Sequence, residues 1–256
     1  MFPGLFRTRT LVVAGVLVVL VGVGLWLWQS ARSSTPVSQE DALAAFREQG
    51  GAAGTRGDGV PRPGVYTYRQ RGSERGGAGP LGVSRDLPSE ARYVITLTRD
   101  GYLEELDLSR EHVEGVRLRV TPAGSRAVWR RTKVTFVGLG RDDRRRLRPP
   151  PLHLPRDLAV GRRWSGEYLA GELPVSYRSE VLRREPVEVG GRDLPAVVVR
   201  TIGDTGGVHP GTRTDTIWWS PALALPLRWT IDMEIRGPVT LDTTADLVLE
   251  DPTPAT

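Results

Sequence analysis

The sequence of 256 residues contains no cysteine, no asparagine and a single lysine, Lys133. The absence of cysteine excludes disulfides, thiolate metal sites, a catalytic thiol and the lipid-modified cysteine that anchors bacterial lipoproteins. Arginine is abundant, but 35 basic residues face 30 acidic ones, so that the net charge is only +5. This mixture of signs is typical of a solvated surface and does not favour a nucleic-acid-binding protein.

Motifs for catalysis and cofactor binding are also missing. The chain has no G-x-S-x-G sequence and no Walker sequence. Residues 77–82 spell G-x-G-x-x-G, but the strand before and the helix after that a dinucleotide site requires are not indicated. The three histidines are His112, His153 and His209, and they lack the spacing of metal ligands. The sequence therefore predicts a protein that is not an enzyme and that uses no cofactor and no metal.

One long hydrophobic run lies near the N-terminus. Residues 11–28 carry no charge, and as a helix they would span about 27 Å, which is enough to cross the hydrocarbon core of a bilayer. Arg7 and Arg9 precede this run, which favours a cytoplasmic N-terminus at residues 1–10. We expect an uncleaved single-pass helix in the cell membrane with the rest of the chain outside the cytoplasm. A cleaved signal peptide is the alternative.

Residues 29–63 are predicted to be a linker that contains one short helix, at residues 39–49. Ser38 is a good N-cap residue, and Asp41 stands three positions later as in a capping box. Apolar residues such as Phe46 follow at helical spacing. The rest of the linker is rich in glycine and proline, which is typical of an exposed tether.

Residues 64–250 show the two-residue period of β-strands. In the stretch PLRWTIDMEIRG, residues 226–237, one parity is apolar and the other is mostly charged. The stretch PVTLDTTADLVLED, residues 238–251, repeats this alternation. Such strands have one face that needs a cover and one that faces water. A tail of six residues, 251–256, follows the predicted β domain.

Hairpin turns are indicated at residues 99–101, 122–125 and 190–191, and no strand–helix–strand spacing appears. We therefore predict one antiparallel sheet of about ten strands, curved into a half-barrel and accompanied by few short helices. A β-sandwich of two packed sheets is the alternative. The insertion at residues 138–161 is too long for a simple turn.

Several segments of the β domain are similar to those of a known group of proteins: GVYTYRQRGSE, LPSEARYVITLTRDG, LPRDLAVGRRW, EPVEVGGRDLPAVVVR and TIWWSPALALPLR. The chain resembles actinobacterial membrane-anchored proteins and, more distantly, the LolA-type half-barrel lipoprotein carriers. The resemblance covers residues 64–250 and implies a curved sheet around an acyl-chain cavity, with a ligand-handling role in the cell envelope. It implies no catalytic residue. The chain departs from these carriers in having no cysteine for lipidation and little helix to fill the concave face.

The apolar faces of the last two predicted strands are the candidate ligand site. A single short helix cannot cover them, so that a bound apolar molecule would gain from their burial. The sequence thus predicts a membrane-tethered, non-enzymatic protein that binds an apolar envelope ligand such as a lipid. A protein-interaction or scaffold module of the envelope is the alternative. The candidate ligand-binding residues are Trp229, Ile231, Met233, Leu241 and Leu247.

A second candidate site is the arginine-rich stretch RDDRRRLR, residues 141–148. Arginine side chains suit phosphate groups, so that Arg144, Arg145 and Arg146 are candidates for contact with an anionic surface such as lipid head groups. The alternative is a solvated loop in which these charges pair with neighbouring aspartates.

Overall fold

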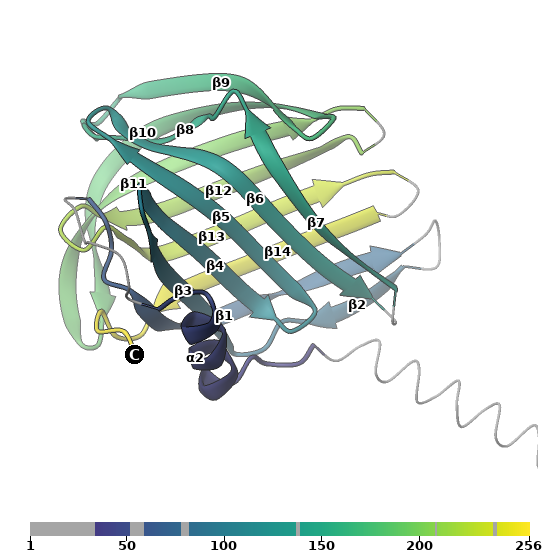
Figure 1. The fold of residues 1–256 in the computed structure, drawn as a ribbon, viewed down its shortest axis with the longest axis horizontal. Coiled ribbons are helices and arrows are strands. Elements are labelled where there is room, and N and C mark those ends of the chain that lie inside the picture. Colours follow the sequence, from purple (N-terminus) through teal and green to yellow (C-terminus); the bar gives the residue numbers. More distant parts are fainter. Residues whose placement is uncertain (1–33, 52–58, 78–81, 137–138, 208, 238–239) are drawn as a thin grey trace, which may run out of the picture.

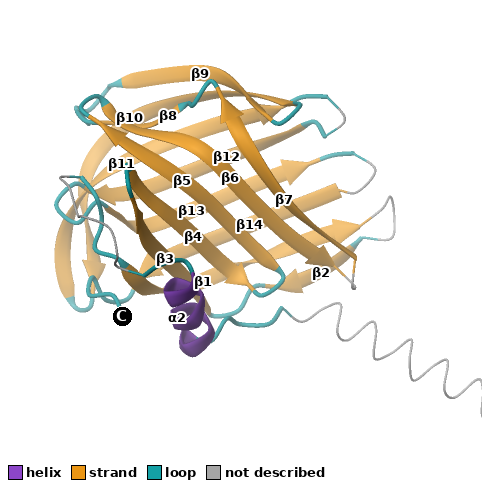
Figure 2. Ribbon diagram, viewed as in Figure 1, coloured by secondary structure: helices purple, strands orange, loops and turns teal. Residues whose placement is uncertain are grey.

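The computed structural model describes residues 34–51, 59–77, 82–136, 139–207, 209–237 and 240–256. Most of these residues form β-strands joined by short turns, and one helix accompanies them (Figure 2). The predicted membrane helix at residues 11–28 lies outside the described residues, as does part of the linker, residues 52–58. In the part of the chain that is described, no helix has the length and apolar character needed to cross a membrane.

The helix is α2, Gln39–Glu48. The strands are β1 Gly64–Gly77, β2 Val83–Asp86, β3 Glu90–Thr98, β4 Gly101–Ser109, β5 His112–Thr121, β6 Gly124–Phe136, β7 Leu139–Arg148, β8 Leu152–Pro155, β9 Arg163–Ala170, β10 Leu173–Val189, β11 Arg192–Thr205, β12 Gly211–Ser220, β13 Leu225–Ile235 and β14 Thr240–Leu249. The predicted turns at residues 99–101, 122–125 and 190–191 join consecutive strands and are confirmed.

The strands form one antiparallel sheet that closes on itself (Figure 1). From β3 to β14 the path follows the chain order, and β1 pairs both with β3 and with β14. Strands β2 and β8 lie beside this path, so that 12 strands make the ring. The prediction of a half-barrel was therefore wrong, because ten residue pairs join the first and last strands. A single sheet also contradicts the two-sheet sandwich.

Helix α2 packs on the outside of the barrel, where Figure 1 shows it against β1 and β3. Its start is fixed by Ser38, whose side chain accepts a hydrogen bond from the Asp41 backbone N–H at 3.1 Å. Its apolar side, including Phe46, packs with Val65 and Val94. The predicted helix is confirmed, but it covers the convex face of the sheet and leaves the concave face to the strands.

The position of α2 defines which side chains point inward. Val65 and Val94 face the helix, so that Tyr66 and Tyr93, one position along each strand, point into the barrel. Residues that pair across an antiparallel ladder share a face. Following the register from Tyr93 therefore assigns an inward direction to side chains all around the ring.

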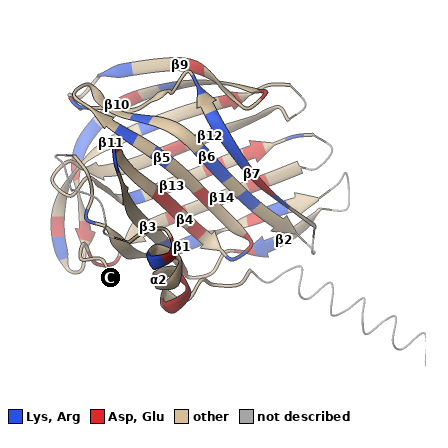
Figure 3. Ribbon diagram, viewed as in Figure 1, with Lys and Arg blue, Asp and Glu red and all other residues tan. Residues whose placement is uncertain are grey.

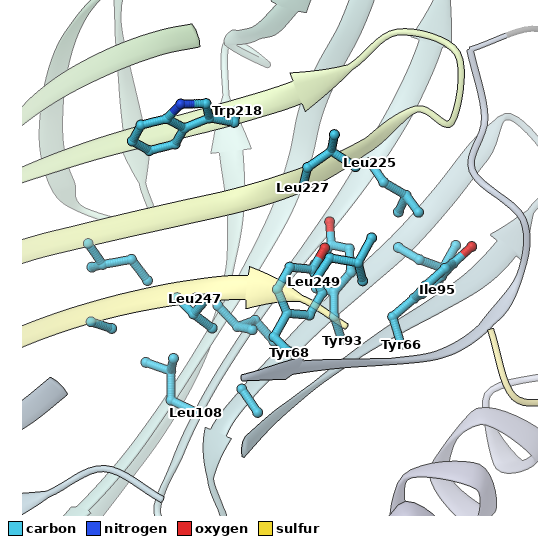
Figure 4. Packing of buried hydrophobic residues seen from close by; sticks show 14 of the residues in the cluster. Tyr66, Tyr68, Tyr93, Ile95, Leu108, Trp218, Leu225, Leu227, Leu247 and Leu249 are labelled. Carbon is cyan, nitrogen blue, oxygen red and sulfur yellow. The ribbon is translucent and has the colours of Figure 1, made fainter. Parts of the chain in front are cut away.

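One half of the barrel interior is tightly packed, and we call it the packed half. Most of its buried side chains come from β1, β3, β4, β13 and β14, and they belong to one apolar cluster that extends to Ala127 on β6 and Leu147 on β7. Figure 4 shows Tyr68 and Tyr93 close to Leu249, and the rings of the two tyrosines meet edge to face at 5.8 Å. These five strands are consecutive in the ring, and the curvature of the sheet brings side chains of non-adjacent strands together, as for Tyr93 on β3 and Trp229 on β13, whose ring centroids lie 6.5 Å apart. The apolar faces of these strands thus cover one another, which is what the predicted half-barrel needed a ligand to do.

The insertion at residues 138–161 contains two strands that the sequence pattern did not indicate. β7 pairs with β6 along eight residues, and β8 takes its place farther along β6. Charged residues occupy both faces of β7, so that the apolar alternation by which strands are recognised is missing. This strand is needed for closure, since it stands between β6 and β9 in the ring.

The direction of β13 side chains gives a matched test of the fold. Ile231 is 2% exposed and points inward, whereas Asp232 is exposed on the outer face. We expect Ile231→Asp to lower the free energy of unfolding by about 3 kcal/mol or more, because it buries an unpaired carboxylate. Asp232→Ile should change it by less than about 1 kcal/mol. Urea denaturation of the full-length protein in mild detergent, followed by tryptophan fluorescence, measures both. Equal losses would mean that the strand is not half-buried.

The contact between β1 and β14 gives a second matched test. A Cβ atom at Gly72 would lie 2.0 Å from the Thr244 carbonyl oxygen, so that no side chain fits where the ring closes. A Cβ atom at Gly203 in β11 would lie 3.7 Å from its nearest neighbour, the Ser176 carbonyl oxygen. Gly72→Ala should therefore cost about 2 kcal/mol or more, and Gly203→Ala less than about 0.5 kcal/mol, in the same denaturation experiment. A tolerated Gly72→Ala would contradict this closure.

Candidate functional site

A buried ion pair connects two opposite walls of the barrel. Glu114 on β5 and Arg213 on β12 both point inward, and these strands lie opposite each other in the ring. Arg213 Nη1 donates to both carboxylate oxygens of Glu114, at 2.6 and 2.7 Å. We call this contact the cross-lumen bridge. It separates the packed half from the half lined by β6, β7, β9, β10 and β11.

The bridge continues toward β1 and β2 through three further charged side chains, His112, Glu74 and Arg85. His112 Nδ1 contacts Glu74 Oε1, and its Nε2 lies 3.3 Å from Glu114 Oε1. Arg85 Nε and Nη2 donate to Glu74 Oε2 at 2.9 and 2.7 Å. All of these side chains are buried, and Arg85 lies opposite Glu74 in the β1–β2 ladder. Each buried carboxylate is thus held between two cationic groups, which offsets its desolvation.

These contacts decide the protonation of the buried groups. Burial by itself lowers the pKa of His112, but the Glu74 and Glu114 carboxylates outweigh it and raise this pKa from 6.5 to about 9. Burial likewise opposes the ionisation of Glu114, yet Arg213 and His112 hold its pKa well below the usual value. His112 and Arg85 lower the pKa of Glu74 in the same way. At neutral pH His112 is therefore a cation between two carboxylates.

Arg213 is also paired on its own strand. Its Nε and Nη2 donate to Asp215 at 2.7 and 3.0 Å, and the indole Nε1 of Trp229 donates to the same carboxylate at 2.9 Å. Two carboxylates therefore share one guanidinium, so that four of its five N–H donors are used within the protein. The bridge is a structural element that divides the lumen.

The half of the lumen beyond the bridge, which we call the accessible half, is reached by solvent. Several of its inward side chains on β6, β9 and β10 keep intermediate exposure. Neighbouring strands pair with both edges of β6 and β10 along much of their length, whereas β9 is paired on both edges only at residues 169 and 170. Tyr168 and Tyr177 illustrate this, with ring centroids 6.1 Å apart on the inner face. An inward side chain of such a ring gains exposure from the lumen, from its two ends or from a stretch where neighbouring strands are not paired. Leu154, Val181 and Val199 form a buried apolar cluster next to these residues.

The accessible half has a weak point in its wall. β7 and β9 are joined by only two residue pairs, Leu147 with Ala170 and Arg148 with Leu169. Among the described strands, only β6 pairs with β7 residues 139–145. A free strand edge of this length leaves backbone groups exposed and is commonly protected by charged side chains. The inward charged residues of this free edge are Arg141, Asp143 and Arg145.

The predicted ligand-binding residues all point inward but differ in burial. Ile231, Met233 and Leu247 are buried in the packed half, where they contact other side chains of the core. Trp229 and Leu241 are half-buried, so that solvent still reaches them. Contact of these residues with a ligand stays a prediction, and the more exposed positions are Trp229 and Leu241.

The predicted anionic-surface residues do not share one face. Because β7 is a strand, Arg144 and Arg146 point outward and are exposed, whereas Arg145 points into the lumen. Figure 3 shows the basic residues along β7 beside β6. Asp143 contacts Arg141 and Arg145, so that the internal pairing expected for a solvated loop occurs within a strand. Sequence spacing alone grouped three arginines that the fold separates.

Sequence reasoning missed the buried charges Glu74, His112, Glu114 and Arg213. A signal for some of them exists, because Arg213 and Asp215 have the same parity as Ile217 in an otherwise amphipathic strand. A charged residue at a position where the alternation expects an apolar one indicates a polar group that points inward. Only the register between strands shows which residue it pairs with. Within the described residues, no group of three or more His, Asp and Glu side chains has the arrangement of a metal site.

The sequence matches no protein-family model and no curated protein. Among solved structures, the chain is similar to the hypothetical lipoprotein YmcC from Escherichia coli K12, with a TM-score of 0.33 and 11% sequence identity. That alignment covers 74% of this chain and 86% of the other.

The buried network predicts how stability depends on pH. The pKa of His112 is raised from 6.5 to about 9 by folding, so that its contribution is complete below pH 6.5 and is lost as the pH rises through 9. This shift corresponds to a loss of up to about 3 kcal/mol of unfolding free energy. Urea denaturation at pH values from 6 to about 10 measures it. His112→Gln should remove the part of the fall that lies above about pH 8.

Asp107 provides the control for that experiment. Burial and the Glu105 charge raise the pKa of Asp107 from 3.8 to about 8. The free energy of unfolding therefore falls as the pH rises from 3.8 to 8, because ionised Asp107 is favoured in the unfolded chain. Asp107→Asn should therefore flatten the stability curve below pH 8 and leave the fall through pH 9 unchanged. An Asp107→Asn curve that stays level from pH 6.5 to 9 would mean that His112 is neutral in the folded protein.

Proposed function

We propose that this protein is a non-enzymatic β-barrel that binds an apolar molecule of the cell envelope, such as a lipid, in its lumen. In this proposal residues 11–28 tether the barrel to the cell membrane and hold it outside the cytoplasm. The ligand occupies the accessible half. The packed half and the cross-lumen bridge form the rigid wall against which it lies.

The partial exposure of inward side chains in the accessible half is the observation that carries this proposal. Positions such as Tyr168, Val175 and Tyr177 point inward and carry large apolar surface, yet they are not buried as their counterparts in the packed half are. Covering such surface yields about 25 cal/mol per Å², or about 0.8 kcal/mol for each CH₂ group of a ligand. A chain of methylene groups would use this gain without requiring precise polar partners.

The pairing between β7 and β9 is short, and it offers a ligand a route into the lumen, which supports the proposal. The two residue pairs that hold these strands together can separate at lower cost than the ten that join β1 and β14. A ligand entering from the side would meet the accessible half directly. The same edge carries charged side chains, which keep it from pairing with other chains.

Adjacent positions on β10 give a matched test of ligand binding. Val175 points into the lumen and is half-buried, whereas Ser176 points outward and is exposed. Val175→Trp should fill the accessible half and lower the amount of bound apolar molecule several-fold, and Ser176→Trp should leave it unchanged. Native mass spectrometry of the full-length protein after purification in mild detergent, with extraction of bound lipids, measures retention. Near-UV circular dichroism checks that both variants are folded.

Two outcomes would contradict the proposal. Wild-type protein that carries no apolar molecule, even after incubation with an extract of cell-envelope lipids, would argue for a dry lumen. Equal retention by wild type and Val175→Trp would place any bound molecule outside the accessible half.

A further inference from the structure

Two arginines occupy directly opposite positions of the β6–β7 ladder on the inner wall of the accessible half. Arg130 on β6 pairs directly with Arg145 on β7 in the antiparallel register. Thr132 pairs with the inward Glu114 on one side and with Asp143 on the other, so that Thr132 and Asp143 also point inward. Arg130 and Arg145 lie two positions along the same strands and therefore point inward as well. Side chains that stand directly opposite on neighbouring strands have Cβ atoms about 5 Å apart, and like charges at such positions repel each other. We call these residues the arginine pair.

The charges around Arg130 leave its guanidinium incompletely satisfied. Its Nη2 donates to Glu114 at 3.3 Å, but the same carboxylate receives two shorter hydrogen bonds from Arg213 and also lies beside His112. The Nε of Arg130 is buried and has no hydrogen-bond partner. A buried donor without a partner costs free energy unless a ligand or water supplies an acceptor.

Arg145 is similarly underpaired. Its Nη2 donates to Asp143 at 3.3 Å, and Asp143 also contacts Arg141. Three inward guanidiniums, those of Arg130, Arg141 and Arg145, therefore have few acceptors. Asp143 contacts both Arg141 and Arg145, and Glu114 accepts one long hydrogen bond from Arg130. The side chains of Arg130 and Arg145 are 30% and 42% exposed, although they face inward, so that a ligand in the lumen can reach them.

The surroundings of the arginine pair are apolar on one side. The next inward residues along β6 and β7 are Ala127 and Leu147, and both are buried. Leu147 pairs with Ala170 on β9, and Tyr168 is the next inward residue of that strand. On β5, Val116 stands opposite Arg130. The pair thus marks the boundary between the charged end of the accessible half and its apolar part.

We infer that the arginine pair, Arg130 with Arg145, binds the oxyanion of an amphiphilic ligand, a carboxylate or a phosphate, whose apolar chain lies in the accessible half. An oxyanion between the two side chains would relieve their repulsion and accept hydrogen bonds from both guanidinium forks. Its position beside the free edge of β7 places the head group where β7 and β9 are least connected. This inference rests on the proposed function and narrows it to anionic amphiphiles.

The test compares an acid with an alcohol of the same chain. The full-length protein in nanodiscs of zwitterionic phosphatidylcholine is incubated with dodecanoic acid or with dodecanol, each carrying a diazirine near the chain end. After illumination, labelled residues are identified by peptide mass spectrometry. We expect the acid to label inward residues of the accessible half about tenfold more than the alcohol does, as is typical when a charged hydrogen-bonded group is added.

Variants of neighbouring arginines provide the controls. Arg145→Gln should lower labelling by the acid about tenfold and leave labelling by the alcohol unchanged. Arg145→Lys, which keeps the charge but loses the fork, should retain an intermediate level. Arg144→Gln changes the adjacent residue, which points outward with a 62% exposed side chain, and should alter neither probe. Near-UV circular dichroism again checks folding.

The outcomes separate this inference from the proposed function. If acid and alcohol label the lumen equally, and Arg145→Gln changes neither, the head-group assignment is wrong while the ligand-binding barrel stands. If neither probe labels the lumen, the proposed function itself fails. Inorganic phosphate at millimolar concentration is added as a third arm. Complete displacement of the acid by phosphate would mean that the pair binds a free oxyanion, which would overturn the assignment to an amphiphile.

Discussion

The pairing of β1 with β14 is the constraint on which the rest of the structure depends. It converts a curved sheet with two free edges into a ring, and so gives every strand an inner and an outer face. The apolar inner faces of β1, β3, β4, β13 and β14 then cover one another. The only described helix, α2, lies on the outside (Figure 1), and side chains of the strands fill the interior.

Closure also encloses charges, and their pairing shapes the lumen. Glu74 and Glu114 point into the ring, where a lone carboxylate would be costly, and His112, Arg85 and Arg213 compensate them. Because Arg213 comes from the opposite wall, satisfying Glu114 draws β5 and β12 together. The lumen is thereby divided into a packed half and an accessible half. The arginine pair lies on the accessible side, where fewer carboxylates remain to neutralise it.

Much of the secondary structure could be read from local patterns. The alternation in residues 226–237 correctly indicated that Ile231 is buried and Asp232 exposed. Successive side chains of a strand point to opposite faces, so that this pattern arises wherever one face of the strand is covered and the other faces water. β7 shows where this approach fails. Its residues are charged on both faces, so that the sequence contains no periodic apolar signal, and only pairing with β6 makes the segment a strand.

The sequence by itself determined the antiparallel strands, several of their turns and the start of α2, because these features depend on residues close together in the chain. Ser38 caps its helix through Asp41, three positions away. The tertiary structure alone decided that the sheet closes, that Glu114 meets Arg213 and that Arg145 faces inward while Arg144 and Arg146 do not. Each of these outcomes depends on the register between distant strands, and a shift of one residue would reverse the direction of every side chain involved.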